Sequence, residues 1–159
     1  MPYYTLEVAN SVLERSFAVG KAVSPNRMHA LLLLMEAEYS RKTRGRDLLS
    51  ESVLNVTPEG LVFPSVEWKF GCYRGSYIKR YSRDANDGAF CIATGQDTIF
   101  DAVIALVWAG SMGYSDDELM AATTRSNVWQ HALDRSERYV KTVDATEGLQ
   151  YRNMLPEFA

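Results

Sequence analysis

The stretch SPNRMHALLLLMEAEY, residues 24–39, combines a helix start with the most apolar run of the chain. Ser24 is suited to capping a helix N-terminus, and Pro25 suits the first helical position, where its missing N–H costs nothing. One face carries apolar side chains at helical spacing: Met28, Leu31, Leu32, Met35 and Tyr39. Leu33 and Leu34 extend the apolar surface around the cylinder, which is typical of a helix surrounded by others. The sequence therefore predicts a mainly α protein with a central apolar helix.

A basic cluster follows this helix, formed by Arg41, Lys42, Arg44 and Arg46 around Gly45. Cations stabilise the negative C-terminal end of a helix dipole, and a glycine commonly ends a helix. We favour this structural interpretation. A phosphate-binding or partner-binding site is the alternative.

Further helices are predicted on both sides of the central one. Apolar residues recur at helical spacing over residues 5–19, with Gly20 as the cap, and again from Asp97 to near Gly113. Ser115 and Glu118 fit a capping box that opens a short helix. A last helix is expected after Ser126 and contains these apolar residues: Trp129, Leu133 and Val140.

Between the second helix and residue 64 the helical period is lost, and residues 48–63 are expected to form a short loop or β element. Pro58 and Gly60 mark a turn there. Pro64 is expected to open another helix, whose apolar side would carry residues three or four positions apart: Val66, Phe70, Tyr73 and Tyr77. Gly71 and Gly75 weaken that helix.

The composition is that of one globular domain, with 159 residues, of which 47% are hydrophobic and 23% are charged. It excludes a disordered chain, a collagen and a disulfide scaffold. We expect a single compact multi-helix domain over residues 1–141 and a polar C-terminal tail over residues 142–159. The longest apolar run, residues 30–35, is far shorter than a membrane span, and the N-terminus has no signal-peptide pattern. We therefore expect a cytoplasmic protein with no membrane contact.

The net charge of −3 conceals an uneven distribution along the chain. Residues 1–83 carry 12 Lys and Arg against 8 Asp and Glu, whereas residues 84–159 carry 5 against 12. The total excludes a polycation that would bind nucleic acid through charge alone. The uneven distribution is compatible with a basic N-terminal portion that binds an acidic partner.

Catalytic groups are few, and we expect no enzyme, no metal and no cofactor. His29 and His131 lie in different predicted helices without a metal-ligand partner at helical spacing, and we expect both at the surface or an interface. Cys72 and Cys91 belong to no metal-binding or catalytic motif. The acidic residues near 97 and 116 are explained by helix capping.

The stretch over residues 68–83 mixes aromatic and basic side chains, among them Trp68, Tyr73, Arg74 and Tyr77. Aromatic rings stack on bases and cations neutralise phosphates, so it is the best candidate for nucleic-acid binding. Core packing or protein contact is favoured over nucleic acid, because the tyrosines recur every fourth residue and the chain is acidic overall.

The order of three blocks resembles the Panacea domain, the SocA/GepA-like family of antitoxins and phage-associated proteins. Residues 8–10 and 24–32 resemble its start, residues 59–70 its "YGPVxPxVYxxF" segment, and residues 113–129 its "YGxLSxxELxxLTHxxxPW" ending. The matching positions are Pro25, Leu31, Gly60, Val62, Pro64, Val66, Leu119, Thr123 and Trp129. The chain departs from the family pattern at Leu61, Trp68, Thr124 and Val128.

This resemblance implies a small, mainly helical, non-enzymatic domain of bacterial or phage origin that binds and neutralises a cognate toxin. SocA-like members are also described as adaptors that deliver a bound toxin to a protease. Tyrosine, tryptophan and arginine are enriched in binding hot spots. We therefore expect a partner-binding face formed by Trp68, Tyr73, Arg74 and Tyr77, flanked by Arg41, Lys42 and Arg44. The alternatives are a nucleic-acid-binding regulator using residues 68–83 and a phage accessory protein that assembles with itself.

Overall fold

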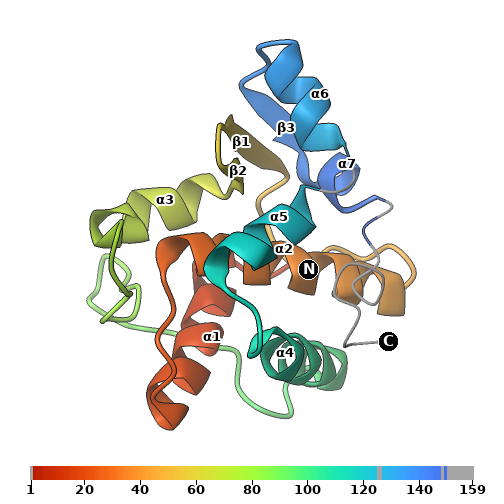
Figure 1. Cartoon of the computed structure of the whole chain (residues 1–159). Coiled ribbons are helices and arrows are strands. Elements are labelled where there is room, and N and C mark those ends of the chain that lie inside the picture. Colours follow the sequence, from red (N-terminus) through yellow and green to blue (C-terminus); the bar gives the residue numbers. More distant parts are fainter. Residues whose placement is uncertain (1, 125–126, 148, 150–159) are drawn as a thin grey trace.

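Helix α2 (Pro25–Lys42) runs through the middle of the molecule, with α1, α3, α4, α5 and α7 all packed against it (Figure 1). The computed structural model describes residues 2–124, 127–147 and 149. The other elements, in chain order, are α1 (Thr5–Val19), β1 (Val53–Thr57), β2 (Gly60–Val62), α3 (Pro64–Phe70), a 3-10 helix η1 (Gly71–Tyr73), α4 (Thr98–Ser111), α5 (Asp116–Thr123), α6 (Val128–Asp134), β3 (Tyr139–Lys141) and α7 (Thr142–Thr146). The fold is mainly α, as predicted. No helix in the described part of the chain is long and apolar enough to cross a bilayer.

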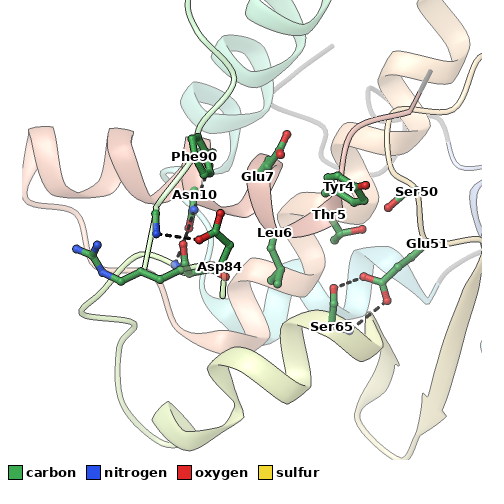
Figure 2. Close-up of a pocket in the computed structure, with 13 residues that line it drawn as sticks. Tyr4, Thr5, Leu6, Glu7, Asn10, Ser50, Glu51, Ser65, Asp84 and Phe90 are labelled. Atoms are coloured by element: carbon green, nitrogen blue, oxygen red, sulfur yellow. Dashed lines mark hydrogen bonds between the residues drawn. The ribbon is translucent and has the colours of Figure 1, made fainter. Parts of the chain in front are cut away.

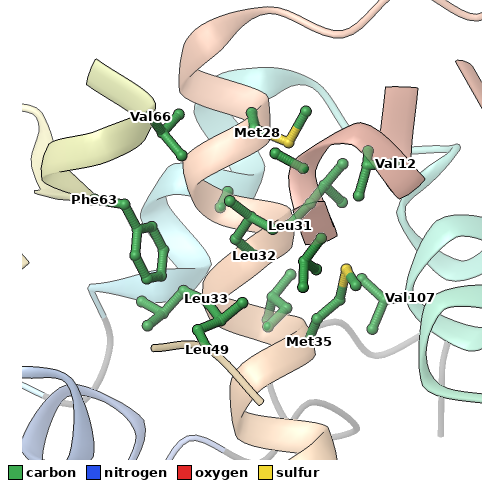
Figure 3. Close-up of a cluster of buried hydrophobic side chains, with 14 of the residues drawn as sticks. Val12, Met28, Leu31, Leu32, Leu33, Met35, Leu49, Phe63, Val66 and Val107 are labelled. Atoms are coloured by element: carbon green, nitrogen blue, oxygen red, sulfur yellow. The ribbon is translucent and has the colours of Figure 1, made fainter. Parts of the chain in front are cut away.

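The central helix begins and packs as its sequence predicts. The Ser24 hydroxyl accepts a hydrogen bond from the Arg27 N–H at 3.1 Å, and Pro25 occupies the first turn. Of its 18 residues, 14 are buried. Leu31 and Leu33 point to nearly opposite sides and are 1% and 2% exposed. Figure 3 shows Leu33 beside Leu49 on one side of α2, and Met35 beside Val107 on another.

The element expected over residues 48–63 contains an antiparallel hairpin, β1 and β2, which β3 extends in the order β2-β1-β3. Leu54 pairs with Val140 across the β1–β3 ladder. The hairpin turn is closed by Thr57, whose hydroxyl donates to the Gly60 carbonyl and accepts from its N–H. Gly60 has a φ of +151°, and a side chain there would approach the Met120 methyl group to 2.9 Å. The turn at Pro58 and Gly60 is thus confirmed.

Helices α3 and α6 are both shorter than the sequence predicts. Helix α3 ends at Phe70, and the expected continuation through Tyr73 and Tyr77 is wrong: Gly71 begins a 3-10 turn, and Gly75 takes a left-handed φ of +81°. Residues 74–97 contain no helix or strand, although the structure describes all of them.

Val140 also lies outside the helix predicted for it. Helix α6 ends at Asp134, and Ser136 adopts a left-handed φ of 56° that turns the chain back toward β1. Val140 then enters β3, where its side chain is 9% exposed. Ser126, the expected cap of α6, lies outside the described residues.

The stretch expected to be a polar tail begins inside the folded domain. Residues 142–146 form α7, which packs against α2 and β3. Thr142 and Ala145 are buried, and Leu149 beyond the helix is 6% exposed.

The burial of α2 on opposite sides yields a stability prediction. Leu31→Ala and Leu33→Ala should each lower the free energy of unfolding by about 2–5 kcal/mol, because each leaves a cavity in close-packed surroundings. Val143→Ala on α7, where the side chain is 61% exposed, should change it by less than about 0.5 kcal/mol. Urea unfolding followed by circular dichroism measures all three. A small effect for either leucine would contradict a centrally buried α2.

Candidate functional site

The aromatic and basic residues singled out by the sequence lie on α3 and the segment after it. Trp68 projects from α3 with 80% of its surface exposed, and the Lys69 ammonium lies 5.4 Å from its ring centroid. Tyr77 is 54% exposed. Arg74, also exposed, forms an ion pair with Glu67 of α3. We call Trp68, Arg74 and Tyr77 the aromatic surface. Tyr73 does not belong to it, because its ring is half-buried against the core.

Arg74 and Tyr77 belong to residues 74–97, a segment without regular secondary structure. Two polar residues of α1, Asn10 and Ser11, bind the backbone of this segment. The Asn10 amide donates to the Ser82 and Phe90 carbonyls at 2.9 and 3.0 Å, and its oxygen accepts from the Ser82 N–H at 2.7 Å. The Ser11 hydroxyl accepts from the Ile92 N–H at 3.0 Å. Asn10 and Ser11 are themselves buried. These bonds satisfy backbone groups that a long irregular segment otherwise leaves unpaired.

The first part of this segment has two further attachments. The Ile78 N–H donates to the Val23 carbonyl at 2.8 Å, just before α2 begins. The Tyr81 ring meets Phe17 of α1 edge to face, with the centroids 5.1 Å apart. Long irregular segments in compact domains are usually functional, and this one presents side chains from a fixed backbone.

The predicted flanking cations lie elsewhere. Arg74 and Tyr77 border a hollow of about 320 Å³ that Ser24 and Pro25 also line, at the first turn of α2. Arg41 and Lys42 are in the last turn of the same helix, about 24 Å away along its axis, and Arg44 follows them. Arg41 is paired with the buried carboxylate of Glu38. The structure therefore does not bring the two groups together on one face.

His29 was expected at the surface or an interface, and this is wrong because α2 is buried on that side too. The imidazole is 1% exposed and stacks against Phe63 with the planes 7° apart. Its Nδ1 accepts the Phe63 N–H at 3.0 Å, which fixes the junction between β2 and α3. Nε2 has no hydrogen-bond partner among the described residues, and Glu67 Oε2 is 3.7 Å away. Burial, together with the nearby charge of Arg74, lowers the pKa of His29 to about 4.

The residues that carry the family resemblance have structural roles. Pro25 and Pro64 open α2 and α3, and Gly60 forms the hairpin turn. The indole N–H of Trp129 donates to the Thr57 carbonyl at 2.7 Å and joins α6 to the hairpin. The remaining positions are all buried: Leu31, Val62, Val66, Leu119 and Thr123. The departing residues Leu61, Thr124 and Val128 also lie in or beside the core and helix ends.

A groove of about 520 Å³ lies between the start of α1, the start of α3 and residues 82–90 (Figure 2). Leu6 lines its middle, and Tyr4 and Phe90, which are 72% and 57% exposed, line its sides. Glu51 stands at one end, where its carboxylate accepts the Ser65 N–H and hydroxyl at the start of α3. Asp84 stands at the other end, where Oδ1 accepts the Asn86 and Gly88 N–H groups.

Sequence reasoning missed this groove and the anchor beside it. One signal was present: Asn10 follows Leu6 by four residues and precedes Leu13 by three, so it interrupts the apolar face of α1. A polar residue on such a face needs a partner inside the protein. Nothing in the sequence identified that partner as a segment 72 to 80 residues further on.

Neither a metal site among the described residues nor a match to a known protein family was found. The described residues include no cluster of three or more His, Cys, Asp or Glu side chains placed to hold a metal ion. Compared with protein-family models, curated proteins and solved structures, the chain has no match.

Asn10→Ala should release the segment over residues 74–97. The change leaves three backbone groups of Ser82 and Phe90 without hydrogen-bond partners. Each buried polar group without a partner lowers the stability of the folded state by about 1–3 kcal/mol. Trypsin should then cut after Lys79, Arg80 or Arg83 at least about tenfold faster under native conditions, because local opening frees the backbone around these exposed side chains to enter the protease. Asn26→Ala, at an exposed position of α2, is the matched control. Equal cleavage rates for the two variants would show that Asn10 does not anchor the segment.

The buried neutral His29 predicts acid sensitivity. In the unfolded chain histidine protonates near pH 6.5, whereas in the folded protein the pKa is about 4, so protons favour unfolding between these values. As pH falls from 7 to 4, wild type should lose about 3 kcal/mol of unfolding free energy relative to His29→Asn. Asparagine keeps an acceptor near Nδ1 and does not titrate. Parallel pH profiles of the two proteins in urea unfolding would contradict this assignment.

Proposed function

We propose that this chain is a non-enzymatic protein-binding domain whose partner contacts the aromatic surface. The observation that carries the proposal is Trp68, a large apolar side chain of α3 that is 80% exposed, with Arg74 and Tyr77 also exposed in the segment that follows the helix. These three residue types dominate binding hot spots. Helix α3 fixes the backbone of Trp68, and the hydrogen bond from the Ile78 N–H to the Val23 carbonyl holds the backbone next to Tyr77, so little ordering entropy is lost on binding.

The partner we propose is a cognate toxin that the domain neutralises, directly or by delivery to a protease. The resemblance to the Panacea domain supports this role, since it implies a domain that binds and neutralises a cognate toxin. A bacterial or phage origin and a cytoplasmic location belong to the same proposal.

Nucleic-acid binding is the second candidate, favoured by five cations on and after α3. They are Lys69, Arg74, Lys79, Arg80 and Arg83. Three of them already have partners: Arg74 is paired with Glu67, the Lys69 ammonium donates to the Arg83 carbonyl, and Arg83 contacts Asp87. This weakens the case for a phosphate-binding surface relative to a protein-binding one.

The test is co-expression with the product of the adjacent reading frame. Growth arrest by that product alone, rescue by this chain and co-purification of the two are expected. Trp68→Ala and Tyr77→Ala should each weaken the complex about tenfold or more, as hot-spot truncations do. Tyr139→Ala, at an aromatic residue of β3 that is 60% exposed, is the matched control and should not.

Three results would count against the proposal. A neighbouring product that is harmless alone removes the antitoxin role. Retention of the complex by a folded Trp68→Ala, Tyr77→Ala double variant removes the aromatic surface as its site. Binding of a DNA or RNA fragment at low salt, falling steeply with log salt concentration, favours the nucleic-acid regulator instead.

A further inference from the structure

The groove between α1, α3 and residues 82–90 has an apolar middle and charged ends. Leu6 and Phe90 present apolar surface along it, and Tyr4 adds an exposed ring (Figure 2). Its volume of about 520 Å³ falls within the roughly 300–1,000 Å³ of ordinary ligand sites. A site of this size suits a short segment of chain rather than the face of a whole domain.

The charges of the groove have one dominant sign. Glu7, Glu51 and Asp84 all line it. The cation of the lining, Arg83, directs its guanidinium to the Asp87 carbonyl at 2.9 Å and lies 3.9 Å from the Asp87 carboxylate, and Asp87 is not part of the lining. The groove is therefore acidic despite the basic character of residues 1–83.

The order of carboxylates and apolar side chains along the groove determines which sequence of charged and apolar groups a ligand needs. In Figure 2, Asp84 and Glu51 stand on opposite sides of Leu6, with Glu7 between them on α1. A chain laid along the groove would meet carboxylate, apolar surface and carboxylate in turn. Complementary charge on such a ligand gives both attraction and register.

The walls of the groove are set before any ligand binds. Asn10 holds the carbonyl of Phe90 while the ring remains exposed, and Glu51 holds the first turn of α3 through Ser65. Preorganised walls favour binding, because the ligand does not have to order them.

We propose that this groove binds an extended peptide segment in which large apolar side chains are flanked on both sides by lysine or arginine. The apolar side chains lie against Leu6 and Phe90. One flanking cation faces Asp84 and Glu7, and the other faces Glu51. This goes beyond the proposed function, since it concerns a different set of residues from the aromatic surface and holds whether or not that surface binds a toxin.

Synthetic peptides test this directly with the full chain. The probe is a fluorescein-labelled Lys-Lys-Leu-Phe-Leu-Lys-Lys peptide, and its controls are Glu-Glu-Leu-Phe-Leu-Glu-Glu and Lys-Lys-Ser-Ser-Ser-Lys-Lys. Fluorescence anisotropy should show the probe binding at least about tenfold tighter than either control, a difference of about 1.4 kcal/mol. Amide chemical shifts in a labelled sample should change at residues 4–10 and 82–90.

Variants localise the binding to the groove. Glu7→Lys reverses a charge on α1 and Phe90→Ser removes an exposed ring, and each should weaken the probe about tenfold. Glu14→Lys, at an exposed position two turns along the same helix, is the matched control and should not. Circular dichroism checks that each variant is folded.

Each alternative outcome overturns the proposal. Absence of probe binding, equal binding of the acidic peptide, or unchanged binding by Glu7→Lys shows that the groove does not select this pattern. A wild-type dimer in sedimentation that Glu7→Lys converts to a monomer assigns the groove to contacts between copies of the chain. None of these outcomes depends on Trp68 or Tyr77, so the proposed function stands or falls separately.

Discussion

A helix that is buried on several sides must satisfy its buried polar side chains inside the protein, and in α2 two charged side chains do this by binding the backbone of neighbouring segments. Arg27 donates to the carbonyls of Ser111 and Tyr114, where α4 ends and the chain turns into α5. Glu36 accepts the N–H groups of Leu48 and Leu49, and burial raises its pKa to about 7. An unpaired buried charge would cost several kcal/mol, so these contacts are a condition of the packing.

The same helix sets the position of α4 through a shared carboxylate. Asp97 caps α4 by accepting the N–H groups of Ile99 and Phe100, and its other oxygen accepts hydroxyl donors from Tyr39 of α2 and Tyr3. Tyr3 is itself bound to the chain after α2, where its N–H meets the Leu48 carbonyl. One acidic residue thereby connects three separate parts of the sequence around the core.

The sequence predicted the elements that depend on local residue patterns. It failed for elements whose conformation depends on partners far away in the chain. The apolar run of α2, the cap at Ser24, the capping box at Ser115 and the turn at Gly60 are local, and all are confirmed. Helix α3 was predicted too long because the tyrosine spacing was followed across two glycines. Val140 was predicted helical because the edge of β1 that it pairs with is about 86 residues away in the chain.

The site was foreseen only in part, for a related reason. Trp68, Arg74 and Tyr77 were chosen for their chemistry, and the structure leaves all three exposed, the first on α3 and the other two in the segment after it. Arg41, Lys42 and Arg44 were added because they belong to the basic N-terminal portion of the chain, but the length of α2 separates them from Arg74 and Tyr77. The groove was missed because its walls come from three segments that only the tertiary structure joins.

The way residues 74–97 are attached has a consequence for how this protein can diverge. Asn10 and Ser11 hold the segment by its peptide groups, which every amino acid except proline offers alike. Exposed side chains along it, such as Tyr77, Arg80 and Phe90, can therefore be exchanged without altering the attachment. Selection, or an engineer building a library, can vary the chemistry of this surface while the helical body keeps its sequence.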